Sequence, residues 1–146
     1  MRLVIQRVKR ASVKVNSQII GKINIGLLIF LAVYHEDIES DVKRAAQKVS
    51  RLRIFEDNAG KMNKSVLEIG GEILVISQFT LYGDCTKGNR PSFIQSARPD
   101  KADKLYRYFI EQMRITGLNV QTGKFQTYME VELINDGPVT LIVDTR

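Results

Sequence analysis

The sequence predicts a single-domain α/β fold in which a mixed β-sheet is combined with two main helices over residues 1–146. Two segments, 37–52 and 99–117, place apolar residues at helical spacing. Two apolar runs, 27–33 and 73–76, have the length of buried strands, and each precedes one of those helices. This order favours a mixed sheet with two helical crossovers. A chain of 146 residues is also long enough to enclose a hydrophobic core.

The strands in the first half are expected to be short and separated by turns. Alternation of apolar and polar residues predicts strands at 3–8, 12–15 and 18–25. The run at 27–33 is apolar almost throughout, so both faces of that strand should be covered by helices or by another sheet. A polar stretch at 56–61 supplies a turn after the first helix.

Both predicted helices carry signals at their ends. In the first, acidic residues precede basic ones, which suits the helix dipole. The second begins at Pro99, a residue that the first turn tolerates, and closes at Gly117.

Two further strands are expected near the C-terminus, at 127–134 and 139–143. The residues between them, 135–138, have the sequence Asn-Asp-Gly-Pro, and all four residue types are common in tight turns. A turn is therefore the local prediction. The pattern by itself does not predict a cis Gly-Pro bond, since only about 5 to 6% of X-Pro bonds in folded proteins are cis.

The chain carries 22 Lys and Arg residues against 16 Asp and Glu, a net charge of +6. This balance favours polyanionic partners, but the basic residues are dispersed, so charge alone leaves nucleic-acid contact and a solvated surface equally open. No apolar stretch approaches the roughly 18 residues of a membrane span, so no membrane partner is expected. A single cysteine fits a reducing compartment, and the cytoplasm is the expected location.

Several catalytic constellations are excluded by residue counts. His35 is the only histidine, which rules out a multi-histidine metal site, and its strand-to-helix junction favours a solvated side chain. Cys85 lies beside Asp84, whose charge opposes thiolate formation. No glycine-rich phosphate loop occurs, and neither a metal nor a cofactor is expected. A pairing of the carboxylates of Asp84, Asp136 and Asp144 stays open.

The strand that begins near residue 73 has an unusual polar end. Ser77, Gln78 and Thr80 directly follow its apolar run. Since the carboxyl ends of strands border the ligand crevice in α/β sheets, these side chains are candidate site residues. Strand alternation would place Gln78 and Thr80 on one side and Ser77 with Phe79 on the other. The alternative, which the residues alone favour, is a strand end that bonds only to its own neighbours.

Several short motifs follow one another in order along the chain. They are Ile5-Gln6-Arg7-Val8, Arg53-Ile54-Phe55, Ser77-Gln78-Phe79-Thr80-Leu81, Arg90-Pro91-Ser92-Phe93, Gln121-Thr122-Gly123 and Asn135-Asp136-Gly137-Pro138-Val139-Thr140. Together they resemble the D-aminoacyl-tRNA deacylase family of the D-tyrosyl-tRNA deacylase type, over almost the whole chain. The resemblance implies a largely antiparallel, barrel-like sheet with two main helices. It also implies a homodimer with its sites at the subunit interface.

An activity follows from the same resemblance. The family hydrolyses the ester that joins a D-amino acid, or glycine mischarged on tRNA(Ala), to the 3′ end of tRNA, which is chiral proofreading in translation. The implied catalytic residues are Ser77, Gln78, Phe79 and Thr80. Gly137 and Pro138, as a cis pair, would reach in from the partner subunit to reject L-amino acids. The aminoacyl-tRNA 3′ end is thus the expected partner, and no DNA is expected.

Such an ester does not require an acid or base side chain, because its neighbouring ribose hydroxyl already activates it. One oxyanion donor is worth roughly 2.7 to 4 kcal/mol, and positioning adds more. A backbone N–H near Phe79 and Thr80 is the expected donor. Thr80 is expected to position the substrate, since a threonine nucleophile needs a base and His35 is a poor candidate. Two other classes stay open: an RNA-binding module that uses exposed aromatics such as Tyr82 or Phe93, and another small-ester or amide hydrolase.

Overall fold

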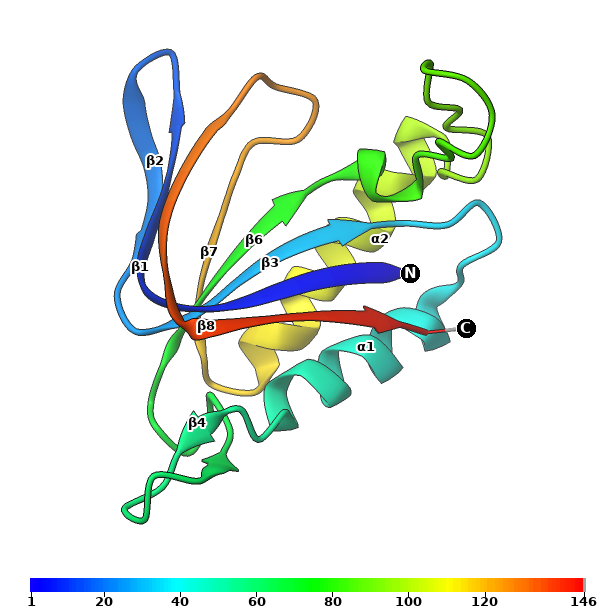
Figure 1. Cartoon of the computed structure of the whole chain (residues 1–146). Helices are drawn as coiled ribbons and strands as arrows, with labels where there is room; N and C mark the ends of the chain where they lie inside the picture. Colours follow the sequence, from blue (N-terminus) through cyan, green and yellow to red (C-terminus); the bar gives the residue numbers. More distant parts are fainter. Residues whose placement is uncertain (146) are drawn as a thin grey trace.

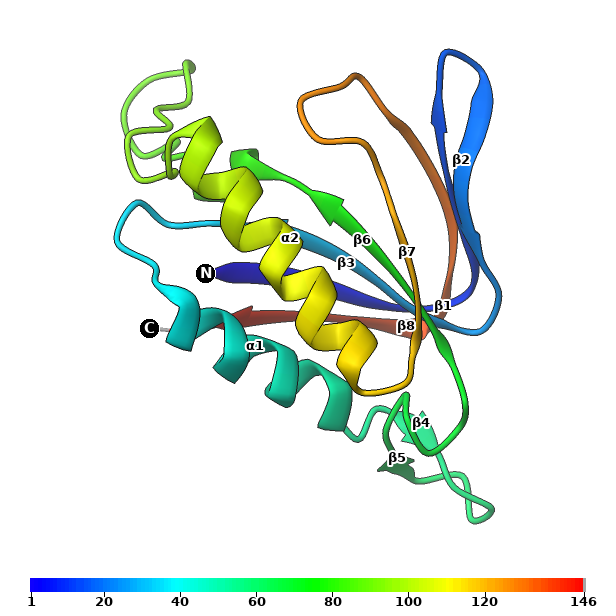
Figure 2. The ribbon, with the colours of Figure 1, turned by 180° about the vertical axis from the view of Figure 1, so that it is seen from behind.

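The computed structural model describes residues 1–145 and contains a six-stranded mixed sheet with two long helices on one face (Figures 1 and 2). The sheet consists of β1 (Arg2–Val15), β2 (Gln18–Ile23), β3 (Gly26–Ala32), β6 (Glu72–Ser77), β7 (Asn119–Thr122) and β8 (Glu130–Asp144). A separate hairpin is formed by β4 (Phe55–Glu56) and β5 (Met62–Lys64). The helices are α1 (Glu39–Arg51), the short 3₁₀ helix η1 (Phe79–Tyr82) and α2 (Pro99–Ile115).

The strand order is β2-β1-β3-β6-β7, and β8 pairs with β1. β1 is antiparallel to its three neighbours β2, β3 and β8, whereas the pairs β3–β6 and β6–β7 are parallel. Each parallel pair is joined by a crossover that contains one long helix, and the two helices lie side by side (Figure 2). The predicted mixed sheet with two helical crossovers is confirmed.

The sheet curls until its two ends nearly meet. β1 and β8 run together along most of their length and bend as a pair, which carries β2 towards β7 (Figure 1). A Cβ atom added to Gly21 of β2 would lie 2.9 Å from the carbonyl oxygen of Thr122 in β7, so the backbones approach too closely for a side chain there. The barrel-like sheet that the family resemblance implied is therefore present.

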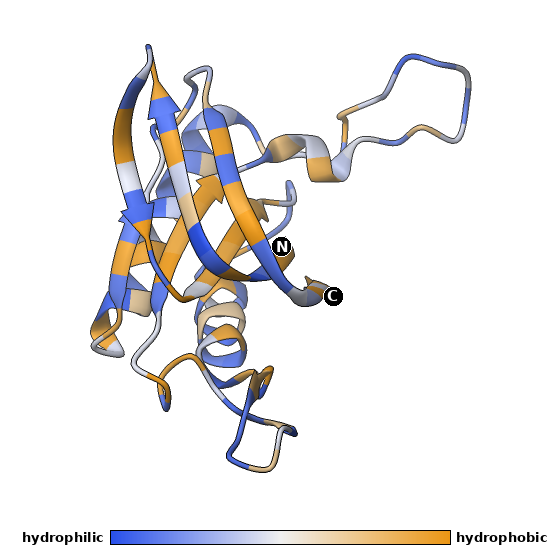
Figure 3. Ribbon diagram, turned by 60° about the vertical axis from the view of Figure 1, so that its left-hand side comes forward, coloured by the Kyte–Doolittle hydropathy of each residue, from blue (hydrophilic) through white to orange (hydrophobic). Residues whose placement is uncertain are grey.

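The central strand β3 is buried on both faces, as its apolar sequence predicts. Leu27, Ile29 and Leu31 belong to the core beneath the helices, whereas Leu28 belongs to a second core inside the curled sheet. This is the period of two expected for a strand. Figure 3 shows the same alternation of apolar and polar residues along the outer strands.

Two predicted pairs of strands are each one continuous strand. β1 runs through the exposed residues Lys9 and Arg10, where its pairing passes from β3 to β2. β8 likewise runs through the predicted turn at 135–138. Asn135 pairs with Val8 and Thr140 with Gln6, so the four residues between them bulge opposite a single residue of β1. The turn prediction is wrong because the long neighbour β1 keeps both halves of β8 in one ladder.

Two other boundaries also differ from the prediction. The strand β7 was not predicted, and β8 begins at Glu130 instead of residue 127. The first helix begins at Glu39 instead of residue 37. Asp37 is fully buried before the helix, where it binds the N-terminal amine of Met1, so it is not a solvated acid of the first turn.

A buried hydrogen bond ties α2 to the strand that leads to the candidate site. The hydroxyl of Tyr106 donates to the carbonyl oxygen of Val75 at 2.8 Å, and the amide of Gly123 donates to the same oxygen at 3.2 Å. Burial, followed by the nearby carboxylate of Asp103, raises the pKa of the Tyr106 phenol above its ordinary value of 10.0.

We expect Tyr106→Phe to lower the free energy of unfolding by about 1 kcal/mol at neutral pH, because one hydrogen bond is lost while Val75 keeps the other. Because the pKa is raised only in the folded protein, this tyrosine ionises at a lower pH in the unfolded chain than in the folded one. Above pH 10, the free energy of unfolding of the wild type should therefore fall by up to about 1.4 kcal/mol per pH unit relative to that of the variant. Urea unfolding of both proteins between pH 7 and 11 measures the difference, and a gap that stays constant with pH would contradict the assignment.

Candidate active site

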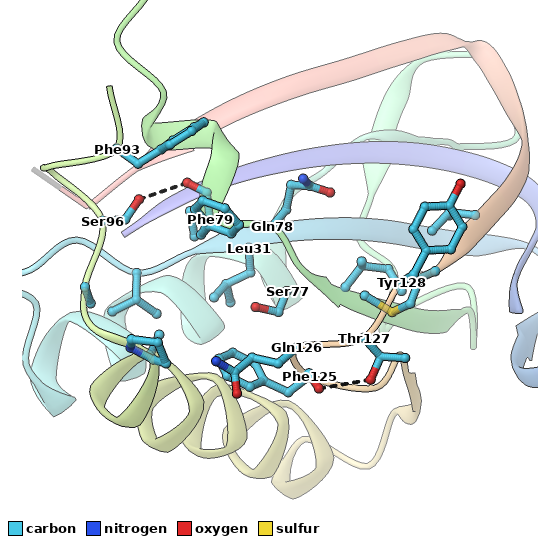
Figure 4. Close-up of a pocket in the computed structure, with 18 residues that line it drawn as sticks. Leu31, Ser77, Gln78, Phe79, Phe93, Ser96, Phe125, Gln126, Thr127 and Tyr128 are labelled. Atoms are coloured by element: carbon cyan, nitrogen blue, oxygen red, sulfur yellow. Dashed lines mark hydrogen bonds between the residues drawn. The ribbon is translucent and has the colours of Figure 1, made fainter. Parts of the chain in front are cut away.

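A pocket of about 610 Å³ opens at the carboxyl ends of the parallel strands β3 and β6 (Figure 4). Leu31 and Ile76 belong to its strand side, and Pro99 and Ala102 at the start of α2 form another wall. The loop between β7 and β8, residues 123–129, closes the remaining side. Such a pocket at a strand edge is the expected place for ligands in α/β sheets.

The structure brings three of the four residues of the Ser-Gln-Phe-Thr motif into this pocket. Ser77, Gln78 and Phe79 line it, and Phe79 is 54% exposed. Thr80 is not among the lining residues. Its hydroxyl oxygen instead accepts a hydrogen bond from Nε2 of Gln78 at 2.5 Å. Thr80 can therefore act on the pocket through Gln78.

The motif does not continue the strand, so the predicted alternation of its side chains is wrong. β3 ends at Ala32, and the last bond along the ladder is donated by the amide of Gln78 to the carbonyl oxygen of Leu31 at 2.8 Å. Without a neighbour to pair with, the chain turns into η1, where the amide of Leu81 donates to the carbonyl oxygen of Gln78 at 3.2 Å.

This turn leaves two backbone donors at the start of η1. The first amides of a helix have no acceptor within it. Within residues 1–145, the N–H groups of Phe79 and Thr80 donate to no other residue. The Phe79 N–H belongs to a residue that lines the pocket, and the Thr80 N–H follows it along η1. An oxygen with developing negative charge is the kind of partner that such donors stabilise.

Ser96 holds the peptide group between those two residues. Its hydroxyl donates to the carbonyl oxygen of Phe79 at 3.0 Å (Figure 4). The ring of Phe79 also meets Phe93 edge to face, with centroids 5.1 Å apart. Because the peptide group is planar and trans, fixing the carbonyl of Phe79 also fixes the direction of the Thr80 N–H. Sequence reasoning missed Ser96, since an isolated serine in a loop carries no signal.

The loop at 123–129 was also missed, although Gly123 belongs to one of the recognised motifs. A Cβ atom on Gly123 would lie 2.5 Å from the sulfur of Met129, so the two ends of the loop touch. Gln126 has a positive φ of 53°, which is uncommon outside glycine, and the hydroxyl of Thr127 donates to the carbonyl oxygen of Phe125 at 3.2 Å. The loop is thus tightly folded against the pocket.

Gly137 and Pro138 lie away from the pocket of their own chain. Their peptide bond is cis, and both residues are exposed. They lie between the two β8 residues that pair with Gln6 and Val8 of β1. On the other side of β1, Gln6 pairs with Leu28 of β3 and Val8 pairs with Gly26. The pocket begins three residues further along β3, at least about 10 Å away. One chain therefore does not unite the two predicted halves of the site.

Arg7 fixes the bulge that carries this pair. Its side chain is buried, and Nε donates to the carbonyl oxygen of Asp136 at 3.1 Å, with the carboxylate of the same residue at 3.5 Å. Nη1 of Arg7 donates to the carbonyl oxygen of Ile54 at 2.6 Å. The bulge is thus anchored to the segment that follows α1.

The other candidate groups do not form a catalytic cluster. His35 and Cys85 are exposed and do not line the pocket. The three carboxylates have separate partners: Asp136 pairs with Arg7, Asp144 pairs with Arg2, and hydrogen bonds from Thr86 lower the pKa of Asp84. In the described part of the chain, no group of three or more His, Cys, Asp and Glu side chains is placed to hold a metal ion. None of the helices in residues 1–145 is long and apolar enough to cross a membrane.

Comparison with known proteins identifies the family. The model of a family described as D-Tyr-tRNA(Tyr) deacylase matches residues 4–144. The chain belongs to this family. Two curated relatives named D-aminoacyl-tRNA deacylase, from Bacillus cereus (strain G9842) and Bacillus anthracis (strain CDC 684 / NRRL 3495), are each 56% identical to it over 146 residues. The match covers 100% of this chain and 100% of each relative.

Two solved structures share the fold of this chain. A protein titled "c-Myc DNA Unwinding Element Binding Protein" superposes with a TM-score of 0.93 at 40% identity, covering 99% of this chain and 98% of that one. A second structure, titled "Structural Analysis of a probable eukaryotic D-amino acid tRNA deacylase", gives a TM-score of 0.85. It covers 97% of both chains at 18% identity, and it therefore supports the fold alone.

Proposed function

We propose that this protein hydrolyses the ester bond of D-aminoacyl-tRNA and releases the free D-amino acid and tRNA. The observation that carries the proposal is the pocket in which Ser77, Gln78 and Phe79 meet at the ends of β3 and β6. The pocket has no histidine or cysteine among its lining residues, so a mechanism based on backbone donors suits it best. The full-length similarity to curated deacylases supports the same substrate.

In the proposed mechanism, the ester carbonyl lies against the start of η1. The free N–H groups of Phe79 and Thr80 donate to the oxyanion as water attacks, and each such donor contributes roughly 2.7 to 4 kcal/mol. Ser96 keeps the Phe79–Thr80 peptide group in position. The 2′-hydroxyl of the terminal adenosine helps to activate the water, so no side chain has to act as a base.

The proposed enzyme is a homodimer in which each pocket is completed by its partner. The separation of Gly137 and Pro138 from the pocket of their own chain supports this arrangement, since both residues are exposed. Backbone carbonyl oxygens close to the substrate α-carbon leave space for hydrogen but not for an L side chain. Glycine has hydrogen on both sides and passes this filter, so glycine mischarged on tRNA(Ala) is also a proposed substrate.

One experiment separates the three classes of function. The pure protein is incubated with tRNA charged with the D- or the L-form of one amino acid, with the free D-aminoacyl ester as control. We expect turnover of the charged tRNA that carries the D-form, but not of the L-form or of the free ester, which lacks the terminal adenosine, and no competition by duplex DNA. Binding without turnover would favour an RNA-binding module. Hydrolysis without regard to tRNA or chirality would indicate a general ester hydrolase, and either result would overturn the proposal.

We expect Thr80→Ala to lower kcat by no more than about tenfold, because it removes one hydrogen bond to Gln78 and leaves the backbone donors in place. Rapid-quench kinetics on D-aminoacyl-tRNA, with mass spectrometry of the quenched protein, measures both turnover and any covalent adduct. Loss of activity in Thr80→Ala, together with a trapped acyl-threonine in the wild type, would make Thr80 the nucleophile instead.

A further inference from the structure

Tyr128 is the most exposed aromatic residue at the mouth of the pocket. It lines the pocket from the loop at 123–129, yet 86% of its surface is accessible (Figure 4). In the described part of the chain, its hydroxyl makes no hydrogen bond and its ring meets no other aromatic ring. Leaving a large ring in water does not stabilise the fold, so its position needs another explanation.

The backbone around Tyr128 is held in place although its side chain is free. Gln126 has a positive φ, the hydroxyl of Thr127 is bonded to the carbonyl oxygen of Phe125, and Met129 packs against the inner core. The loop therefore presents the ring from a fixed base. Across the mouth, Phe79 and Phe93 are already packed against each other.

We propose that Tyr128 stacks on the base of the nucleotide that precedes the terminal adenosine of the substrate tRNA. This inference rests on the function proposed above. If the esterified adenosine occupies the pocket, the unpaired 3′ end has to leave across its rim, where Tyr128 lies. Unpaired bases bind proteins largely by stacking on exposed aromatic rings, and a ring without other partners is suited to this.

A neutral ring also fits a base better than a phosphate. The basic neighbour Lys124 borders a second, polar pocket on the α2 side, whose other charged lining residues are Arg107, Arg114, Asp103 and Glu111. Phe125 lines both pockets, so the second, polar pocket adjoins the one that Tyr128 lines. The base would therefore stack on Tyr128, and the ribose-phosphate backbone would be free to continue past the rim.

The test compares three D-aminoacyl esters that share the same amino acid: the adenosine ester, the cytidylyl-adenosine ester and the charged tRNA. For the wild type, we expect the dinucleotide ester to have a KM about tenfold lower than the adenosine ester. Tyr128→Ala should abolish that advantage and raise KM for charged tRNA by a similar factor. Its effect on kcat and on KM for the adenosine ester should be much smaller than its effect on KM for the dinucleotide ester.

Two further variants act as controls. Tyr128→Phe keeps the ring and should behave as the wild type, whereas Ile94→Ala removes an equally exposed apolar side chain, also 86% accessible, and should change nothing. The inference is overturned if the wild type treats both small esters alike, if Tyr128→Ala affects the adenosine ester equally, or if Tyr128→Phe behaves as alanine does.

Binding of uncharged tRNA separates this inference from the proposed function. Equilibrium binding by the wild type and by Tyr128→Ala is measured on tRNA with an intact 3′ end and on tRNA that lacks its last two nucleotides. We expect the variant to weaken binding of intact tRNA about tenfold and to leave binding of the shortened tRNA unchanged. This binding result tests the role of Tyr128 even if no ester is hydrolysed. Equal binding of intact tRNA by both proteins would refute the proposed stacking.

Discussion

We expect Asp37→Asn to lower the free energy of unfolding by about 3 kcal/mol, because it leaves a buried ammonium group without its counter-charge. The N-terminal amine of Met1 donates to Oδ1 of Asp37 at 2.7 Å, and neither partner is accessible to solvent. The other carboxylate oxygen accepts the amide of Tyr34 at 2.7 Å. The amine also donates to the hydroxyl of Thr145 at 2.6 Å, so one carboxylate joins the start of β1, the end of the described chain and the segment before α1.

Thermal unfolding measures the effect, with an expected fall in melting temperature of about 10 °C. Asp144→Asn is the matched control, since Asp144 pairs with Arg2 at 2.9 Å while both side chains are 37 to 40% exposed. An exposed pair contributes only about 0 to 1 kcal/mol. Equal, small effects of the two substitutions would show that burial of the Asp37 pair does not matter to stability.

We expect Gly137→Ala to weaken the rejection of L-aminoacyl-tRNA by about 100-fold, the order expected from displacing a positioning group by about 1 Å. Gly137 has a φ of 129°, which a residue with a Cβ atom adopts only under strain. The added Cβ would lie 2.8 Å from Cγ2 of Val139 and 3.0 Å from Nη2 of Arg7. The bulge would have to move, and the carbonyl oxygens proposed to exclude L side chains would move with it.

The measurement is the ratio of kcat/KM for tRNA charged with the D- and the L-form of one amino acid. Glu132→Ala, an exposed change elsewhere on β8, is the control and should leave the ratio unaltered. Retained hydrolysis of the D-form shows that the variant is folded. If Gly137→Ala hydrolyses the D-form and still rejects the L-form as the wild type does, the proposed role of the bulge is wrong.

Local sequence patterns were sufficient to predict the types of most elements and to point to one half of the candidate site. Apolar runs and helical spacing identified β3, β6 and both long helices, because local periodicity reports which faces of an element are buried. The presence of a single histidine and a single cysteine disfavoured catalysis by His35 or Cys85, and neither residue lines the pocket. Of the polar residues after the apolar run at 73–76, Ser77 and Gln78 line the pocket at the strand ends, whereas Thr80 does not.

The way in which distant segments meet depends on tertiary pairing. β1 and β8 are continuous because they pair with each other, and that pairing overrides the turn signals at 135–138. β6 ends at Ser77 because its neighbour β3 ends, and the Phe79 and Thr80 amides that follow are left without an acceptor within residues 1–145. Ser96 reaches the pocket from a loop whose local sequence predicts nothing, and Tyr128 reaches it from a loop that the local pattern predicts as the start of a strand. Pairing and closure depend on contacts between residues far apart in the chain, and local patterns do not record such contacts.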